Sequence, residues 1–147
     1  MDQKETNSLH DRVGMIVDFS QKIECSLAKI QAYENVVSAL NENKAQPDRQ
    51  KQILVEADKI YHANLAKTLG QNIQGIKDSG IFKENLELVD SLDEVLKERN
   101  YVVHQLFKKG AQNQCLKAHT QKVLDRLGND VGRLNNLNEK LLKIITD

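Results

Sequence analysis

The sequence has few of the residues that build β-sheets, tight turns or cross-linked folds. Its 147 residues include one proline, no tryptophan, two cysteines and 4% aromatic residues. Because sheet proteins need clusters of β-branched and aromatic residues, this composition predicts an all-α protein. The two cysteines, Cys25 and Cys115, are too few for a disulfide framework. We therefore expect both to be reduced thiols in the core of a cytoplasmic protein.

Long hydrophobic runs are absent as well. No segment approaches the ~18 consecutive apolar residues of a membrane-spanning helix, so no membrane association is expected. Residues 1–7 are polar with mixed charge and lack the apolar stretch of a secretion signal. They are predicted to form a polar N-terminal tail ahead of a single helical domain, residues 8–147. That length is sufficient to bury a core unaided.

Charge is balanced overall but unevenly distributed. The formal net charge is zero, yet residues 1–96 contain 11 Lys/Arg against 16 Asp/Glu, and residues 97–147 contain 10 against 5. One interpretation is that the two ends complement each other across a helical bundle. The other is a phosphate-binding surface, which requires the lysines of the C-terminal third to gather near Arg99. These lysines are Lys97, Lys108, Lys109, Lys117 and Lys122.

Apolar residues recur at helical spacing in four segments. The first predicted helix runs from an N-cap near Ser8 to residues 41–44, and the second runs from Pro47 to Leu69 or through Gly70 as far as residues 78–80. The third runs from residues 82–85 to Lys109, with Gly110 as its C-cap. The fourth runs from residues 111–114 to the end of the chain. Two long helices thus flank two shorter ones, joined by short polar turns. This pattern predicts an antiparallel four-helix bundle.

Each predicted helix carries an apolar stripe that should face the core. The first helix has a heptad-like seam of Leu9, Val13, Ile16, Ile23, Leu27, Ile30, Val37 and Leu40. The second helix has Ile53, Leu54, Ala57, Ile60, Tyr61, Leu65 and Leu69. The stripe of the third helix consists of Val89, Leu92, Leu96, Val103 and Leu106, and Arg99 falls in its gap. A guanidinium in the middle of an apolar stripe keeps its proton, so it must find an anion or water.

Arg99 begins a compact group of polar residues. Asn100 comes next and His104 lies four residues further on, so these two share a helix face. Imidazole is the side chain that ordinarily titrates near neutral pH, which suits a general acid or base. A guanidinium binds phosphate oxygens in a bidentate fashion. Together these groups suit metal-independent RNA cleavage, in which a 2′-hydroxyl attacks the adjacent phosphate.

The Arg99-Asn100-x-x-x-His104 pattern, followed by Leu106-Phe107, resembles the signature of the HEPN superfamily (higher eukaryotes and prokaryotes nucleotide-binding). The resemblance implies a small all-helical domain. Many members are metal-independent ribonucleases of toxin–antitoxin and defence systems that act as dimers, and others are non-catalytic. It implies catalytic roles for Arg99 and His104, an orienting role for Asn100, and an antitoxin or other protein partner. RNA contacts are expected from Lys97, Tyr101, Lys108 and Lys109.

Helix geometry adds a constraint on this site. Residues five apart differ by 500°, or about 140° around a straight α-helix. Arg99 and His104 therefore diverge within one chain, and a single pocket needs a local helix distortion, a long arginine side chain reaching round, or a second subunit. Catalytic members of the HEPN superfamily are dimers whose motifs meet across the interface, so the resemblance implies a site shared between the subunits of a homodimer.

A structural interpretation of the same residues stays open. Arg99 could be neutralised by a carboxylate on another helix, for which Glu34 is a candidate, with His104 hydrogen-bonded at the edge of the stripe. The protein would then be a helical interaction module. Other catalytic signatures, including phosphate loops and dinucleotide fingerprints, are missing. Cys115 and His119 lack a second ligand pair, so no metal and no cofactor are expected.

Overall fold

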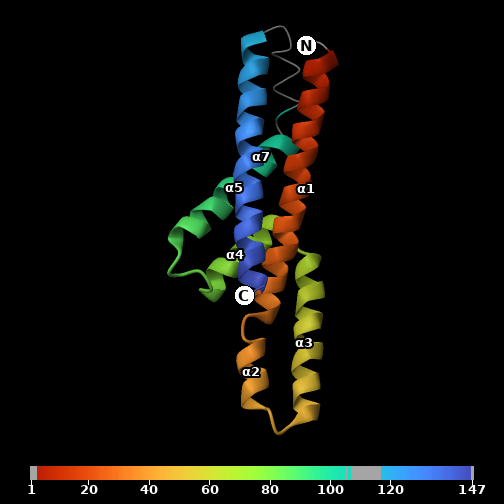
Figure 1. Ribbon diagram of the computed structural model, residues 1–147, viewed down its shortest axis with the longest axis vertical. Coiled ribbons are helices and arrows are strands. Elements are labelled where there is room, and N and C mark those ends of the chain that lie inside the picture. Colours follow the sequence, from red (N-terminus) through yellow and green to blue (C-terminus); the bar gives the residue numbers. More distant parts are fainter. Residues whose placement is uncertain (1–2, 105, 107–116, 147) are drawn as a thin grey trace.

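The computed structural model describes residues 3–104, 106 and 117–146, and every regular element in this part of the chain is an α-helix. The all-α prediction is therefore confirmed for the described residues. The helices are α1 (Gln3–Tyr33), α2 (Val36–Glu42), α3 (Pro47–Leu65), α4 (Leu69–Ser79), α5 (Leu86–His104) and α7 (Lys117–Thr146) (Figure 1).

Helix α1 begins at Gln3, upstream of the predicted start at Ser8. Lys4 and Glu5 favour a helix intrinsically, and the Gln3 side chain donates a hydrogen bond to Asn7 one turn on (2.9 Å). Further along, the predicted seam is confirmed by the burial of Leu9, Ile16, Ile23, Leu27 and Ile30. Helix α1 is thus the central element of the core.

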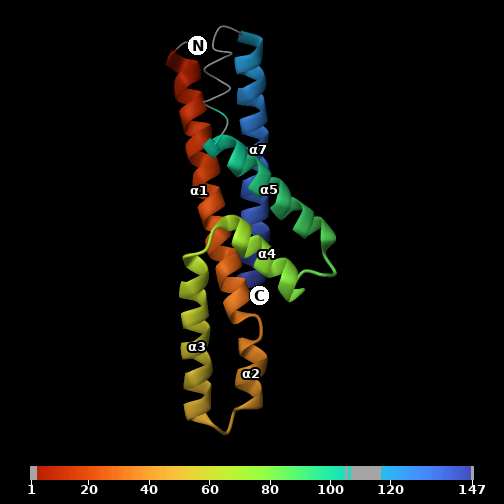
Figure 2. The same ribbon diagram turned by 180° about the vertical axis from the view of Figure 1, so that it is seen from behind.

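The first predicted helix does not run unbroken to residues 41–44. It is interrupted at Glu34–Asn35, and the short helix α2 follows with no buried residue. Val37, which was predicted to continue the seam, is 71% exposed. Beyond Tyr33 the chain leaves the main body and forms an antiparallel arm with α3 (Figure 2). The apolar spacing persists there, but α2 packs mainly against α3 rather than the core.

Helices α3 and α4 are separate, and the break precedes Gly70. Thr68 is the N-cap of α4: its hydroxyl accepts from the backbone N–H of Gln71 (3.1 Å), and the Gln71 side chain accepts from the N–H of Thr68 (2.9 Å). This reciprocal capping box satisfies two amides that the helix start leaves unpaired. A polar network then fixes the corner, because buried Asn72 donates to the carbonyl of Asn64 (3.1 Å).

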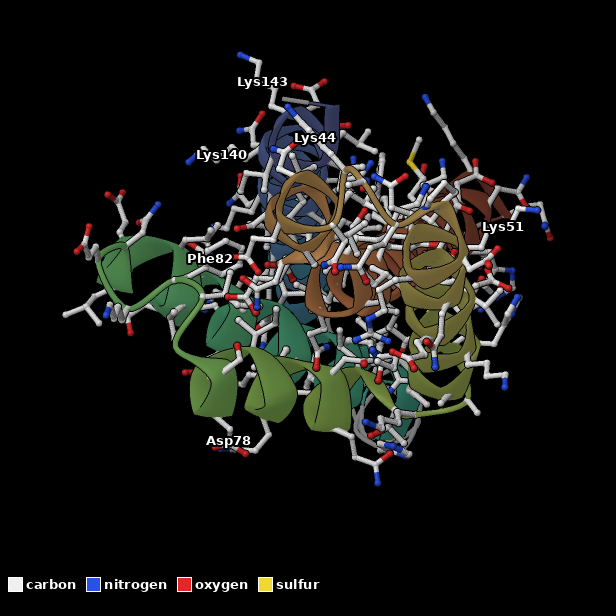
Figure 3. All side chains as sticks on the ribbon, turned by 90° about the horizontal axis from the view of Figure 1, so that it is seen from below. Lys44, Lys51, Asp78, Phe82, Lys140 and Lys143 are labelled. Atoms are coloured by element: carbon white, nitrogen blue, oxygen red, sulfur yellow. The ribbon has the colours of Figure 1, made fainter. Side chains whose placement is uncertain are left out.

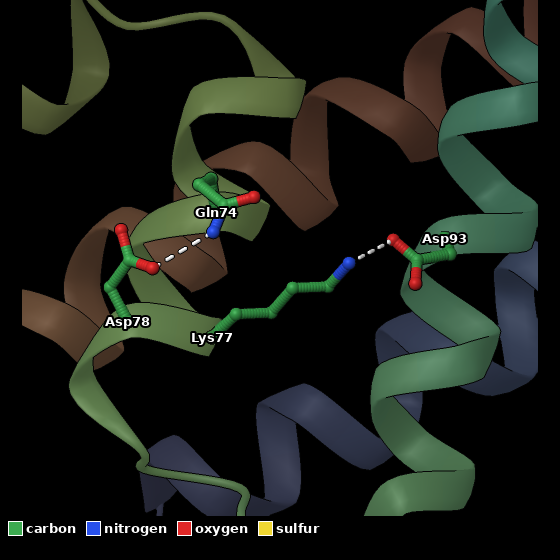
Figure 4. Close-up of polar contacts among 4 residues, drawn as sticks. All are labelled: Gln74, Lys77, Asp78 and Asp93. Carbon is green, nitrogen blue, oxygen red and sulfur yellow. Dashed lines mark hydrogen bonds and ion pairs between the residues drawn. The ribbon is translucent and has the colours of Figure 1, made fainter.

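Helices α4 and α5 form a second protruding hairpin (Figure 1). Gly80 ends α4 in the left-handed conformation (φ 70°), which glycine adopts without steric cost. Lys77 of α4 then donates to Asp93 of α5 (2.8 Å), while Gln74 bonds Asp78 along α4 (Figure 4). In the connection between α4 and α5, the ring of Phe82 is buried against the core (Figure 3). Lys140 and Lys143 project from α7 in the same view.

The first and last helices run parallel rather than antiparallel. Near their beginnings, the Arg12 guanidinium of α1 donates to the carbonyl of Leu124 in α7. Near their ends, Ile30 of α1 and Ile145 of α7 line one groove, and the two helices lie side by side in both ribbon views. An up-and-down four-helix bundle places its first and last helices antiparallel. The antiparallel four-helix arrangement is therefore not confirmed.

None of the helices in the described part of the chain combines the length and apolar character needed to cross a bilayer. This agrees with the prediction that the sequence contains no membrane span.

Candidate functional site

The buried face of α5 is displaced by one residue from the predicted stripe. The core-facing residues are Leu88, Leu92, Val95 and Val102, and Leu106 beyond the helix end is buried too. Val89 and Leu96 are only partly buried, and Val103 is 48% exposed. The sequence places apolar residues in adjacent pairs at 88/89, 95/96 and 102/103. Periodicity alone does not decide which member of each pair faces the core.

Arg99 still falls within the buried stripe by spacing, four residues after Val95 and three before Val102. Arg99 is half-buried, and its Nη1 donates to the Asn100 side chain at 3.5 Å, the outer limit of a hydrogen bond. Asn100 and His104 are exposed, and His104 is the last residue of α5. No contact in the described structure joins Arg99 to His104. The divergence predicted for residues five apart on one helix is consistent with this placement.

The predicted carboxylate partner of Arg99 is not observed. Glu34 is exposed at the end of α1, and among the residues that the structure describes no carboxylate lies within 4.0 Å of the Arg99 guanidinium. Arg99 is therefore half-buried and is not neutralised by a carboxylate within the described chain.

Two of the four predicted RNA-contact residues, Lys97 and Tyr101, lie in the described part of the chain. Lys97 is exposed on α5, whereas Lys108 and Lys109 lie outside the described residues. Tyr101 is half-buried, and the Arg126 guanidinium lies 3.9 Å from the centre of its ring. One face of the ring is thus occupied by a cation of α7.

The structure describes one of the two cysteines. Cys25 is exposed on α1, contrary to the prediction of a core thiol, because the α1 seam passes through Ile23 and Leu27 on the opposite side. Cys115 and the side chain of His119 lie outside the described part. Within the described residues, no group of three or more His, Cys, Asp or Glu side chains could hold a metal ion.

The strongest polar contact of α5 involves Glu98, the residue before Arg99. Its two carboxylate oxygens accept from Arg126 of α7 in a bidentate pair, Oε2 from Nε at 2.9 Å and Oε1 from Nη2 at 2.7 Å. Since Arg126 also stacks on Tyr101, one guanidinium joins two residues of α5 to α7. We call the Glu98–Arg126–Tyr101 group the α5–α7 clamp. It fixes the part of α5 that carries Arg99.

A second carboxyl adjoins this clamp. Asp130 follows Arg126 by one turn on α7 and is 3% exposed. Burial, together with the hydrogen bond to Glu98 and its negative charge, raises the pKa of Asp130 from 3.8 to about 7. Burial opposes ionisation of Glu98 as well, but hydrogen bonds from Arg126 and Asp130 outweigh it and lower the pKa of Glu98. The pair therefore retains a proton, held on Asp130, into the neutral range.

A cavity of about 190 Å³ lies beside this carboxyl pair, between α5 and α7. Its walls carry Glu94 and Glu98 from one helix, and Asp130, Arg133 and Lys140 from the other. Sequence reasoning missed Asp130 and Arg126. They are separated from Glu98 by about one helix length of chain, and only knowledge of which faces of α5 and α7 meet brings them together. A signal was present in the spacing, because Asp130 fills the gap of an apolar helical series, three residues after Leu127 and four before Leu134.

No protein-family model, curated protein or solved structure matches this chain. The residues and their geometry are therefore the basis for assigning a function.

Proposed function

We propose that the protein is a HEPN-like, metal-independent ribonuclease whose site is completed when two copies associate. Arg99 and His104 are its catalytic residues, and Asn100 orients them or the phosphate. The observation that carries this proposal is the state of Arg99. It is accessible, has no carboxylate partner within the described chain, and shares α5 with an exposed histidine.

The proposed reaction is transesterification within the RNA strand. His104 removes the proton of the 2′-hydroxyl, the 2′-oxygen forms a bond to the adjacent phosphorus, and the bond to the 5′-oxygen breaks. The leaving oxygen takes up a proton, supplied by the imidazolium or by water. Arg99 stabilises the charge that develops on the phosphoryl oxygens. A 2′,3′-cyclic phosphate and a 5′-hydroxyl result, and no step requires a metal ion.

Two features of α5 support a site shared between two copies. Arg99 and His104 lie about 140° apart around the helix, so their side chains leave it in different directions. Val103 is 48% exposed and lies four residues after Arg99, on the same side of α5. An exposed valine beside an unneutralised arginine suits a surface that a second copy covers, and that copy supplies the missing histidine.

The wider family features belong to the same proposal. Helices α1, α4, α5 and α7 share one core, with α2 and α3 as an added arm, and we assign these four as the HEPN-like helices. Lys97, Lys108 and Lys109 are assigned to the RNA backbone. Tyr101 stacks on a base only with the ring face that Arg126 leaves open. The proposed setting is a toxin–antitoxin or defence system, with an antitoxin or another protein as partner.

Cleavage of a single-stranded RNA in the presence of EDTA tests the catalytic assignment. Arg99→Ala and His104→Ala should each reduce the rate by at least 100-fold, since each removes a group with a role in the transition state. His62→Ala, which removes an exposed histidine of α3, is the matched control and should retain the wild-type rate. Equal cleavage by all variants, or none by the wild type, contradicts the proposal.

One observation favours a second candidate function, a non-catalytic interaction module. Helix α3 exposes four large apolar residues, Leu54, Val55, Ile60 and Leu65, three of which were predicted to face the core. Exposed apolar residues gathered on one helix often mark a binding surface. For this function, Ile60→Glu should abolish association measured by light scattering while the chain cleaves no RNA. A strictly monomeric wild type that cleaves no RNA and binds no partner contradicts both functions.

A further inference from the structure

The cavity between α5 and α7 has the size of a small-molecule site. Its volume of about 190 Å³ corresponds to roughly six water molecules at ~30 Å³ each. Three buried apolar residues, Val95, Leu134 and Leu137, form part of its lining. A compound with the dimensions of a small amino acid fits this space, whereas a nucleotide does not.

One buried polar side chain of the lining has an oxygen atom that the protein does not hydrogen-bond. Asp130 is 3% exposed; its carboxyl shares a proton with Glu98, and its Oδ2 atom is buried without a further hydrogen-bond partner among the described residues. Native proteins satisfy the great majority of buried polar atoms, because an unpaired one reduces stability by ~1–3 kcal/mol. A buried acceptor that lines a cavity and lacks a donor indicates a ligand that supplies the donor.

The walls of the cavity carry charges of both signs that are not paired with one another. Glu94 lies on the α5 wall, and Arg133 and Lys140 lie on the α7 wall. Within the described chain none of these three forms an ion pair. Lys140 projects from α7 at the rim (Figure 3). The cavity therefore offers acceptors for a cation and donors for an anion within one small volume.

We propose that this cavity binds a small zwitterion of the α-amino acid class. The ammonium group of the ligand donates to Asp130 and Glu94, and its carboxylate accepts from Arg133 and Lys140. An apolar side chain packs on Val95, Leu134 and Leu137. A simple cation would leave Arg133 and Lys140 unpaired, and a simple anion would face three carboxyl groups. The site lies on the face of α5 opposite the exposed residues Asn100 and His104, so this inference does not depend on the ribonuclease proposal.

Isothermal titration calorimetry with the standard L-amino acids tests the proposal on the full-length protein. Isobutylamine and 3-methylbutanoate are valine without its carboxylate and without its ammonium group, and they separate the zwitterion from its two halves. At least one amino acid of the panel should bind, and valine should bind at least tenfold more tightly than either half-molecule. Backbone amide shifts at residues 91–98 and 130–140 should locate the ligand in the cavity.

Variants of the cavity provide the matched comparison. Asp130→Asn and Arg133→Gln should each weaken binding of the amino acid by at least tenfold. Asp90→Asn and Lys51→Gln remove the same charges from exposed positions outside the cavity and should leave the dissociation constant unchanged. If no amino acid binds the wild type more tightly than Asp130→Asn, or if isobutylamine binds as tightly as valine, the proposal is wrong.

Discussion

At the scale of single residues, the carboxyl pair Glu98 and Asp130 is the most unusual feature of the molecule. One guanidinium, that of Arg126, compensates two carboxyls at the contact between α5 and α7. Two neighbouring buried carboxyls repel each other unless one of them keeps its proton. The stability of the protein should therefore depend on pH in the range where Asp130 titrates.

Asp130→Asn tests this dependence. Because the folded pKa of Asp130 is about 7 and its ordinary value is 3.8, the folded state binds the proton more tightly. Its contribution to stability is fully present below pH ~4 and is lost as pH rises to ~7. Asparagine keeps a donor for Glu98 and carries no charge. The variant should match the wild type at pH 4 and exceed it by about 1–3 kcal/mol at pH 8.

Thermal unfolding at pH 4, 6 and 8 measures this difference. Asp90→Asn, at an exposed position of α5, is the control and should show a constant difference from the wild type. A difference for Asp130→Asn that does not change with pH would show that Asp130 holds no proton in the folded state.

Arg126→Ala addresses the α5–α7 clamp from its cationic side. The Glu98 side chain is only 15% exposed, so removing Arg126 leaves a poorly solvated carboxylate next to a second carboxyl. The stacking on Tyr101 is lost as well. We expect a loss of about 1–3 kcal/mol in urea unfolding at pH 8, and recovery of part of this loss in the Glu98→Gln/Arg126→Ala double variant. If the loss in the double variant equalled the sum of the losses of Glu98→Gln and Arg126→Ala, the two residues would not interact.

At the scale of helices, backbone chemistry made several boundaries predictable. Pro47 begins α3 and Gly80 ends α4 as expected, and Thr68 followed by Gln71 is a capping-box pattern that could have located the α3–α4 break. The interruption after Tyr33 was not predictable from spacing, because the apolar period continues into α2. Adjacent apolar pairs left undecided which of Val95 or Leu96, and of Val102 or Val103, faces the core.

The corner between α1, α3 and α4 depends on a buried amide network rather than on apolar contacts alone. Asn72 is fully buried, donates to the carbonyl of Asn64, and accepts from the Gln31 side chain at 3.2 Å. Asn72→Leu keeps the branched shape of the side chain but leaves these partners unsatisfied. It should reduce the free energy of unfolding by about 2–3 kcal/mol in urea denaturation.

Gln74→Leu is the comparison for Asn72→Leu, since Gln74 is exposed two residues further along α4 and bonds only Asp78. It should change stability by less than about 0.5 kcal/mol. If both variants were equally stable, the amide network would not hold the corner together.

At the scale of the whole molecule, composition was enough to predict the all-α class, but not how the helices are arranged. Parallel packing of α1 on α7 and the two protruding hairpins result from which apolar faces meet, and local spacing does not contain that information. The same limit applies to function. Arg99, Asn100 and His104 were found from their spacing, whereas their accessibility and the neighbouring Glu98–Asp130 pair required the packed structure.

The central claim is that Arg99 of one copy acts with His104 of another. Mixing the inactive variants Arg99→Ala and His104→Ala tests it directly, because a mixed dimer contains one site with both residues intact. After subunit exchange at equal concentrations, half of the dimers are mixed and one of their two sites is active. Cleavage of RNA in EDTA should therefore recover to about a quarter of the wild-type rate. A mixture as inactive as either variant alone would contradict the shared site.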